Sequence, residues 1–302
     1  TEEKMEKQTV GMIQITVAAV CWGSLGFLGT LLNRAGFDGV QVATLRIVIA
    51  AAVLMLLLPY FMRFLCGLDI KRLPILTAQS LIGMLGMSLL YFAAVAKVGS
   101  SLAVALLYTA PVWSLIFGRM LLGEPITRKA AMLTAVAALG VGLTMAGGMN
   151  FDALGIMIGL GSGICYALYG VLGKKVMTGA PPMMLLFTSV SISALALLCL
   201  PATHQTLAQL AALDVSVWLT ATALSLVGTI IAFGLFVKGL EKMPAAKAAV
   251  FTVFEPFTAV MLAVFLLGEQ LGVLQSVGVF LIIAVAVLNA VGKKEKMEQA
   301  LG

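Results

Sequence analysis

The stretch Ala248–Glu269, AAVFTVFEPFTAVMLAVFLLGE, is almost wholly apolar and long enough to cross a bilayer as one helix. An acid and a proline, Glu255 and Pro256, stand near its middle. A charged side chain at membrane depth costs about 2.5–3.5 kcal/mol on insertion scales. A partner, a proton or a water-filled cavity must compensate for the cost of placing Glu255 at this depth. The stretch therefore predicts a membrane protein built around that position.

The composition of the whole chain points to the same class. Of 302 residues, 61% are hydrophobic and 11% are charged, and the mean hydropathy is +1.10. Soluble domains are nearer to about half apolar and about a quarter charged. The net charge of +6 does not indicate a nucleic-acid partner, because the basic residues lie between apolar segments and not on one stripe. We predict a polytopic, all-α membrane protein with the lipid bilayer as its surroundings.

The apolar segments divide the chain into candidate spans. A crossing needs about 20 apolar residues, and connections between the segments are short. The sequence predicts ten transmembrane helices, at 11–32, 39–61, 73–96, 101–122, 128–148, 153–174, 181–201, 214–237, 245–267 and 272–292.

The distribution of Lys and Arg predicts the orientation of these spans. With the N-terminus in the cytoplasm, sixteen of the 19 basic residues fall on the inner side and two, Arg34 and Lys97, on the outer side. The nineteenth, Arg46, lies within the second span. Cytoplasmic loops carry the excess of positive charge, so both termini, the tails 1–10 and 293–302, are expected in the cytoplasm.

The chain contains an internal repeat. At an offset of 145 residues, Lys97–Glu124 falls on Lys242–Glu269 without a gap, Pro111 meets Pro256, and both stretches end in LLGE. Near an offset of 144, CWGSLGF at 21–27 falls on CYALYGV at 165–171. We expect two repeats of five spans, 11–148 and 153–292. An odd number of spans in each repeat makes the copies point in opposite directions, which is typical of transporters with a site near the membrane midplane.

The repeats and their motifs resemble the drug/metabolite transporter superfamily, in its EamA-type branch. The resemblance rests on Trp-Gly-Ser at 22–24, LRIVIAA at 45–51 with Arg46 in the second span, and FEPFTAV to LLGE at 254–269. It implies a ten-helix bundle in a bacterial-type plasma (inner) membrane that exports or exchanges small metabolites such as amino acids, amines or drugs. It does not name a substrate. Ala110 stands where the first repeat would carry the counterpart of Glu255, so the central carboxylate is single.

Glu255 is the first candidate for the functional site. Thr252 and Thr258 lie one turn away on its helix and give that side polar groups. Intramembrane acids are functional by default, so Glu255 is interpreted as a proton-binding group or as a site for a cationic amine. The alternative is a structural acid that is bonded to a neighbouring helix.

Arg46 is the second candidate, about two turns from the outer end of its span. The small residues Ala43 and Ala50 on its face allow another helix to approach. Arg46 is expected to bind a substrate carboxylate, or else to pair with Glu255 or with helix-end carbonyls. Arg is always charged, so it cannot itself carry a coupled proton.

Prolines and aromatic residues complete the candidate site. Pro111 and Pro256 remove backbone hydrogen bonds and are expected at kinks or hinges. Polar aromatic residues within spans are mostly expected in the core or in interfacial belts. We select three of them as pocket-lining candidates, Trp22, Tyr91 and Tyr166, from a set that also includes Tyr108, Trp113 and Tyr169.

Other motifs are assigned to the scaffold. Gly155, Gly159 and Gly163 form a stripe for close helix packing. Glu124 and Glu269 are expected as interfacial, capping or loop-pairing residues, with a gate as the alternative. The four cysteines fit neither a zinc site nor a disulfide framework. His204, the single histidine, is placed in a short loop. No metal and no cofactor are predicted.

These observations favour a secondary transporter of small molecules that works by alternating access, with or without coupling to H⁺. No nucleotide-binding loop is present in the sequence, so ATP is not expected to be its energy source. The alternatives are a channel-like facilitator and a membrane-embedded enzyme. The enzyme is disfavoured because, at membrane depth, the spans hold one acid, one Arg and no histidine. The sequence leaves the oligomeric state open, and a monomer fits the architecture.

Overall fold

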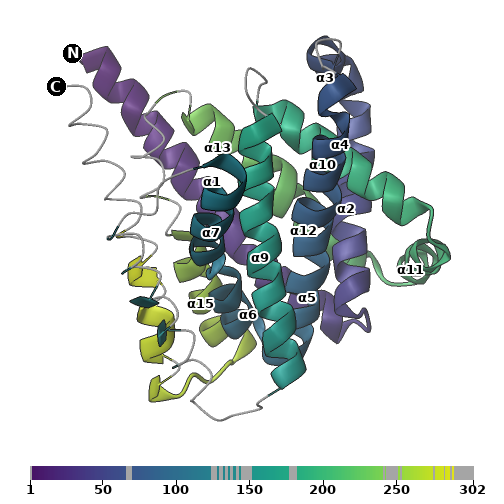
Figure 1. The fold of residues 1–302 in the computed structure, drawn as a ribbon. Coiled ribbons are helices and arrows are strands. Elements are labelled where there is room, and N and C mark those ends of the chain that lie inside the picture. The colour runs from purple at the N-terminus through teal and green to yellow at the C-terminus, as the bar shows by residue number, and fades with distance from the viewer. Residues whose placement is uncertain are drawn as a thin grey trace.

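In the computed structural model, the chain folds into a bundle of helices (Figure 1). The structure describes residues 2–65, 70–123, 152–176, 182–240, 254–274 and 276–281, with isolated positions at 128–143, 242, 251, 283–285 and 288. These described residues are helical or form short connections, without a strand. The all-α fold predicted from the sequence is confirmed.

The two repeats supply corresponding series of helices. The first repeat contains α1 (Glu2–Arg34), α2 (Gly39–Leu56), α3 (Leu58–Leu65), η1 (Ile70–Arg72), α4 (Leu73–Ala78), η2 (Gln79–Gly86), α5 (Met87–Val98), α6 (Ser100–Leu107) and α7 (Ala110–Leu122). The second contains α9 (Ala153–Val176), α10 (Pro182–Leu198), α11 (Pro201–Ala211), α12 (Val215–Ser225), η3 (Leu226–Ile231), α13 (Ala232–Leu240) and α15 (Phe254–Leu267). A further apolar helix covers Ser276–Val285.

Among the described residues, six helices are long and apolar enough to cross a membrane. They match the predicted spans 11–32, 39–61, 73–96, 101–122, 153–174 and 214–237. The predicted span 128–148 and the first part of the span 245–267 lie largely outside the described residues. Large side chains such as Leu56 (80% exposed) and Phe265 (71% exposed) project outward, as expected for surfaces that face hydrocarbon.

Local sequence explains the corner between the first two spans. Asp38 caps α2: its Oδ1 accepts the backbone N–H of Gln41 at 2.8 Å, and the Gln41 side chain accepts the N–H of Asp38 at 2.9 Å. This reciprocal pair is a capping box. Gly36 precedes it with φ of 96°, a backbone conformation that L residues with a side chain rarely adopt. The capping box fixes where the second span begins.

The prediction that His204 lies in a loop is wrong, because it lies in α11. This helix begins at Pro201 and meets the preceding helix at 95°, so it projects to the side of the bundle in Figure 1. Gln209 anchors it: Gln209 accepts a hydrogen bond from Gln41 at 2.9 Å and donates one to the carbonyl of Gly36 at 3.2 Å. The polar composition of α11 favoured a loop, but the segment forms a helix that packs against the turn before α2.

Two of the spans contain a π-helical segment. The third span runs through α4, η2 and α5, and the eighth through α12, η3 and α13; η2 and η3 are π-helical. A π turn holds one residue more than an α turn and commonly marks a functional position. The ends of η2 and η3, Gly86 and Ile231, differ by the 145-residue repeat offset.

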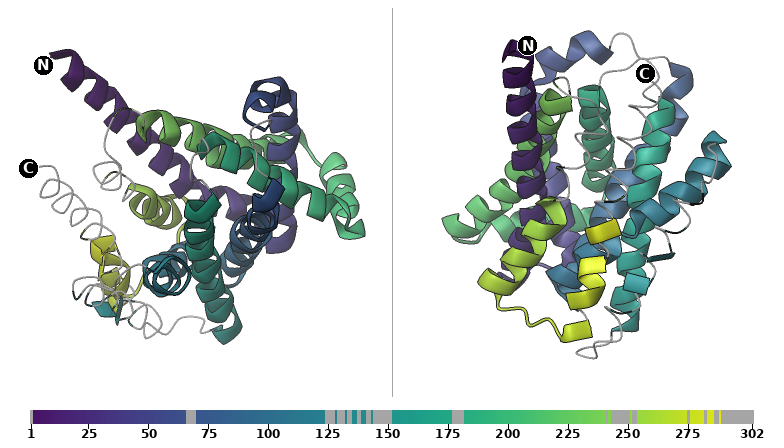
Figure 2. Two further views of the ribbon diagram at one scale, coloured as in Figure 1. Left: turned by 45° about the horizontal axis from the view of Figure 1, so that its top comes forward. Right: turned by 90° about the vertical axis from the view of Figure 1, so that its left-hand side faces the viewer.

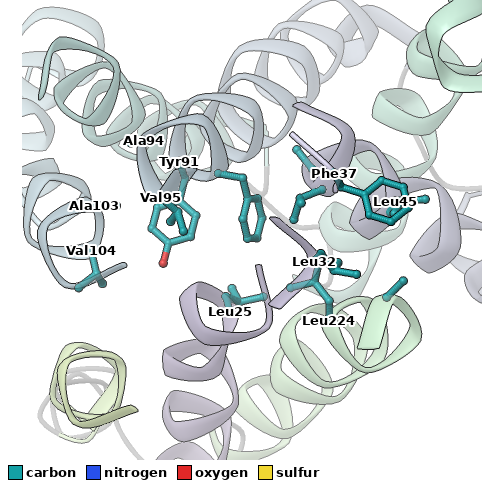
Figure 3. Close-up of a cluster of buried hydrophobic side chains, with 14 of the residues drawn as sticks. Leu25, Leu32, Phe37, Leu45, Tyr91, Ala94, Val95, Ala103, Val104 and Leu224 are labelled. Atoms are coloured by element: carbon teal, nitrogen blue, oxygen red, sulfur yellow. The ribbon is translucent and has the colours of Figure 1, made fainter. Parts of the chain in front are cut away.

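The main core cluster lies between α1, α2, α5, α6 and α12. Leu32, Val42, Leu45 and Phe92 in this cluster are fully buried. Figure 3 shows Tyr91 beside this apolar set, with its ring among Leu25, Val95 and Val104. Figure 2 gives two further views of the bundle; in the left one the N-terminal end of α1 projects beyond the neighbouring helices. The cluster joins helices of both repeats, so the core is shared by them.

The repeated LLGE motif ends helices and caps another. Gly123 and Gly268 follow α7 and α15 with φ of 71° and 72°, so each ends its helix in a left-handed conformation. The next residue, Glu269, accepts the N–H (2.8 Å) and hydroxyl (2.9 Å) of Ser100 and the N–H of Ser101 (3.2 Å). Glu269 thus caps α6 across the repeats, and the expected capping role is confirmed. Glu124 lies outside the described residues.

Candidate functional site

Glu255 lies in the first turn of α15, directly before Pro256. Its side chain is buried, with 8% of the residue exposed. The described residues around it are helical from Phe254 onward. The local sequence thus places an acid on a helix inside the bundle.

The fourth span is interrupted at the corresponding place. Helix α6 ends at Leu107, Tyr108 and Thr109 form a turn, and α7 restarts at Ala110 with Pro111 as its second residue. Pro111 therefore lies at the break between α6 and α7, at the start of the second of these helices. Interrupted helices expose free backbone groups and are typical of transporter sites.

Glycines of α1 bring this helix against the candidate site. A Cβ on Gly23 would lie 2.6 Å from the backbone oxygen of Glu255 and 2.6 Å from the Cβ of Thr258. A Cβ on Gly26 would lie 2.9 Å from the hydroxyl oxygen of Tyr91. The Trp-Gly-Ser motif is therefore explained by close approach of α1 to α15. Thr258 takes part in this packing.

Three tyrosines lie in the same polar region as the Glu255 carboxyl. The phenol of Tyr108 is within hydrogen-bonding reach of it. Tyr91 and Tyr166 lie within range of electrostatic interaction with it. The structure thus brings together two selected tyrosines and adds Tyr108. Its signal in the sequence was its position three residues before Pro111, where the span is interrupted.

Trp22 has a different environment. Its ring packs edge-on against Phe233, with 5.0 Å between centroids, and at a tilt against Phe236, with 5.2 Å. Both phenylalanines belong to α13. These contacts place Trp22 in an aromatic cluster between α1 and α13. Thr252 lies outside the described residues.

Arg46 is buried, with 2% of the residue exposed. Its Nε donates to the hydroxyl of Thr229 at 3.1 Å and its Nη1 donates to the hydroxyl of Ser88 at 2.9 Å. The Phe92 ring centroid lies 5.9 Å from the guanidinium carbon. Glu255 lies within electrostatic range, but these two described residues form no ion pair. The charges therefore belong to one polar region without direct contact.

The Gly155, Gly159 and Gly163 stripe of α9 packs as predicted. Added Cβ atoms would meet Val98 at 2.6 Å, Leu106 at 2.5 Å and Thr109 Oγ1 at 2.5 Å, respectively. The stripe lets α9 lie against the end of α5 and along α6. The helix that carries Tyr166 is thereby held close to the interrupted fourth span.

Asp152 links the start of α9 to the end of α5. Its carboxylate accepts the N–H of Gly155 at 2.9 Å and pairs with Lys97 at 3.4 Å. The hydrogen bond from Gly155, with a smaller contribution from Lys97, holds the pKa of Asp152 below 3.8. Within the described part of the chain, no group of three or more His, Cys, Asp or Glu side chains is arranged to hold a metal ion.

Comparison with protein families extends these observations. A model of the EamA-like transporter family matches residues 9–146 and 153–291. The uncharacterized transporter YwfM of Bacillus subtilis is 31% identical over 177 residues, which cover 55% of this chain and 56% of that protein. This match therefore spans little more than half of YwfM.

Two other relatives align along nearly their full length. An uncharacterized transporter of Archaeoglobus fulgidus is 26% identical over 278 residues, covering 91% of this chain and 94% of that protein. The uncharacterized inner membrane transporter YicL of Salmonella typhimurium is 22% identical, covering 96% and 98%. A solved crystal structure superposes with a TM-score of 0.60 at 18% identity and covers 96% of this chain and 99% of that chain, which supports the fold.

Proposed function

Because the chain belongs to the EamA-like transporter family, we propose that it is a secondary transporter that exports or exchanges small organic metabolites by alternating access. Membership of a transporter family sets the enzyme alternative aside. Within the substrate range that the sequence suggested, organic amines, including the amino group of amino acids, are the class that the site supports best.

One observation carries this proposal: a single carboxyl, Glu255, is buried on α15, with the Tyr108 phenol within hydrogen-bonding reach and Tyr91 and Tyr166 within electrostatic range. An ammonium group gains from a carboxylate by charge and from aromatic faces by cation–π attraction, worth about 0.5–2 kcal/mol per ring. The same carboxylate can hold a proton in place of the ammonium group. Exchange of one for the other would couple export of the amine to import of H⁺.

The proposed placement in the membrane rests on charge and on one relative. The relative YicL is described as an inner membrane transporter, and a bacterial-type inner membrane is proposed for this chain. The Lys and Arg distribution supports cytoplasmic termini. Lys97, Asp152 and Glu269 would then lie at the outer end of the bundle.

Counterflow in proteoliposomes tests the proposal. Purified protein is first screened by thermal shift against amines, amino acids and cationic drugs, and a compound that stabilises the protein is then used with and without a radioactive label. A transporter accelerates uptake of the labelled compound when the unlabelled compound fills the vesicles. Uptake that is insensitive to the internal compound would indicate a channel-like facilitator instead.

A neutral substitution tests the role of Glu255. We expect Glu255→Gln to abolish counterflow and the thermal shift given by amines. Asp214→Asn is the matched control, because Asp214 lies in the connection before α12, away from the site. If Glu255→Gln transports the amine as well as Asp214→Asn does, Glu255 is not the binding group.

A further inference from the structure

The π-helical segments occupy the same place in both repeats. Their last residues are Gly86 and Ile231, and their glycines Gly83 and Gly228 are also separated by 145 residues. Each segment has α-helix on both sides within a single span. A π turn changes the direction and register of the residues after it. The inverted repeats therefore carry the same irregularity twice.

The two glycines make reciprocal contacts. Gly83 lies against α9, where an added Cβ would be 2.7 Å from the Cα of Tyr169, and Gly228 lies against the side chain of Leu25 on α1. Helices α1 and α9 are the first helices of the two repeats, and Leu25 and Tyr169 are separated by 144 residues. Each π segment thus presses on the first helix of the opposite repeat.

Arg46 joins the two segments from a third helix, α2. Its Nε donates to Thr229, which lies within η3, and its Nη1 donates to Ser88, two residues beyond the end of η2. The repeat offset places Ser191 at the position that matches Arg46, and the buried hydroxyl of Ser191 has no hydrogen-bond partner in the described structure. The bridge is therefore made once, by the first repeat alone.

We propose that Arg46 is a positioning residue that couples the two π segments, so that the third and eighth spans bend together. The fork of the guanidinium holds both hydroxyls in fixed directions, which the ammonium of Lys would not do. A charged group held by neutral hydroxyls in a buried place is sensitive to the loss of either one. The bridge thus gives each segment a means to affect the other. The role of this bridge in transport rests on the proposed function, but the coupling between the two π segments does not.

Hydrogen–deuterium exchange of the detergent-solubilised full chain tests the coupling without any substrate. Thr229→Val removes one acceptor from η3. We expect backbone amides of residues 80–90, in the other π-containing span, to exchange at least about fivefold faster, the lower end of usual coupling between sites. Thr229→Ser, which keeps the hydroxyl, should restore the wild-type rate. In the reverse direction, Ser88→Ala should accelerate exchange in residues 226–232.

Matched controls separate coupling from local damage. The hydroxyls of Thr188 and Ser80 bond to carbonyls of their own spans, so Thr188→Val and Ser80→Ala should leave the distant segment unchanged. Faster exchange confined to the span that carries each substitution would overturn the proposal. It would also be overturned if Thr229→Val accelerated exchange of residues 80–90 as much in an Arg46→Lys background as in the wild type. That outcome leaves the counterflow test of transport unaffected, so the two proposals fail separately.

Discussion

Glu269 and Ser100 are joined by two hydrogen bonds on one carboxylate oxygen, from the backbone N–H at 2.8 Å and from the hydroxyl at 2.9 Å. The pair connects the end of α15 in the second repeat to the start of α6 in the first. Gly99, with φ of 82°, makes the sharp turn between α5 and α6 that brings these groups to the carboxylate. A residue of the second repeat therefore caps a helix of the first repeat.

Removing this cap should destabilise the bundle. Helix caps contribute about 0.5–2 kcal/mol, and hydrogen bonds to charged groups about 1.5–3 kcal/mol. We expect Glu269→Ala to lower the free energy of unfolding by about 2 kcal/mol, measured as an earlier thermal transition in detergent. Gln270→Ala is the control at the exposed neighbouring position. Equal transitions for both variants would contradict the capping role.

The Asp152 carboxylate should contribute stability that depends on pH. Its folded pKa is depressed below 3.8 by the Gly155 N–H and by Lys97. A depressed folded pKa stabilises the protein at pH values above the unfolded pKa, and this contribution is lost as pH falls through the folded pKa. We therefore expect the difference in melting temperature between the wild type and Asp152→Asn to be constant near neutral pH. It should shrink progressively below about pH 4.

A difference in melting temperature that persists unchanged to pH 2 would contradict this account. Lys97→Met is a complementary variant, because it removes the charge partner while the Gly155 hydrogen bond is kept.

Gly23 should tolerate no side chain. A methyl group would enter the space of the Glu255 carbonyl and Thr258, so that α1 and α15 must separate. Overpacking of this kind costs about 1–3 kcal/mol, and we expect Gly23→Ala to melt earlier and to lose transport. Gly170 on α9 has nothing within 4 Å of an added Cβ. Gly170→Ala should be neutral or slightly stabilising because alanine favours helix, and equal behaviour of the two variants would refute the packing argument.

Tyr108 should strengthen the binding of a cationic substrate by orienting Glu255. We expect Tyr108→Phe to weaken amine binding about tenfold, the loss of one hydrogen bond to a charged group, measured by titration of the thermal shift. Tyr60→Phe, at an exposed position of α3, is the control. Indistinguishable affinities would remove Tyr108 from the site.

The sequence was sufficient for the fold because its signals are long or repeated. Apolar segments separated by charged connections predicted the spans, and the alignment of Pro111 with Pro256 predicted two copies. The LLGE motif repeats because its glycine ends a helix at positive φ in both copies. The hydrophobic effect and backbone geometry act within a few residues of these patterns, so they can be recognised without a structure.

The details of the site depend on contacts between distant segments. The bonds from Arg46 to Thr229 and Ser88 span 183 and 42 residues, and no local pattern marks such partners. The sequence also does not mark the π segments, because one extra residue in an apolar span leaves the hydropathy of the span unchanged. The polar composition of α11 predicted a loop. The segment is a helix, and its contacts through Gln209 compensate for that composition.

The charges of Arg46 and Glu255 lie in different repeats. At the equivalent positions, the other repeat has Ser191 in place of Arg46 and Ala110 in place of Glu255. A homodimer of the first half would bring two guanidinium groups and no acid to the centre, and a homodimer of the second would bring two acids and no guanidinium. If the chain arose by gene duplication from a symmetric dimer, that ancestor lacked this arrangement. In one polypeptide each half carries one of the two charges, so the polar region needs both halves.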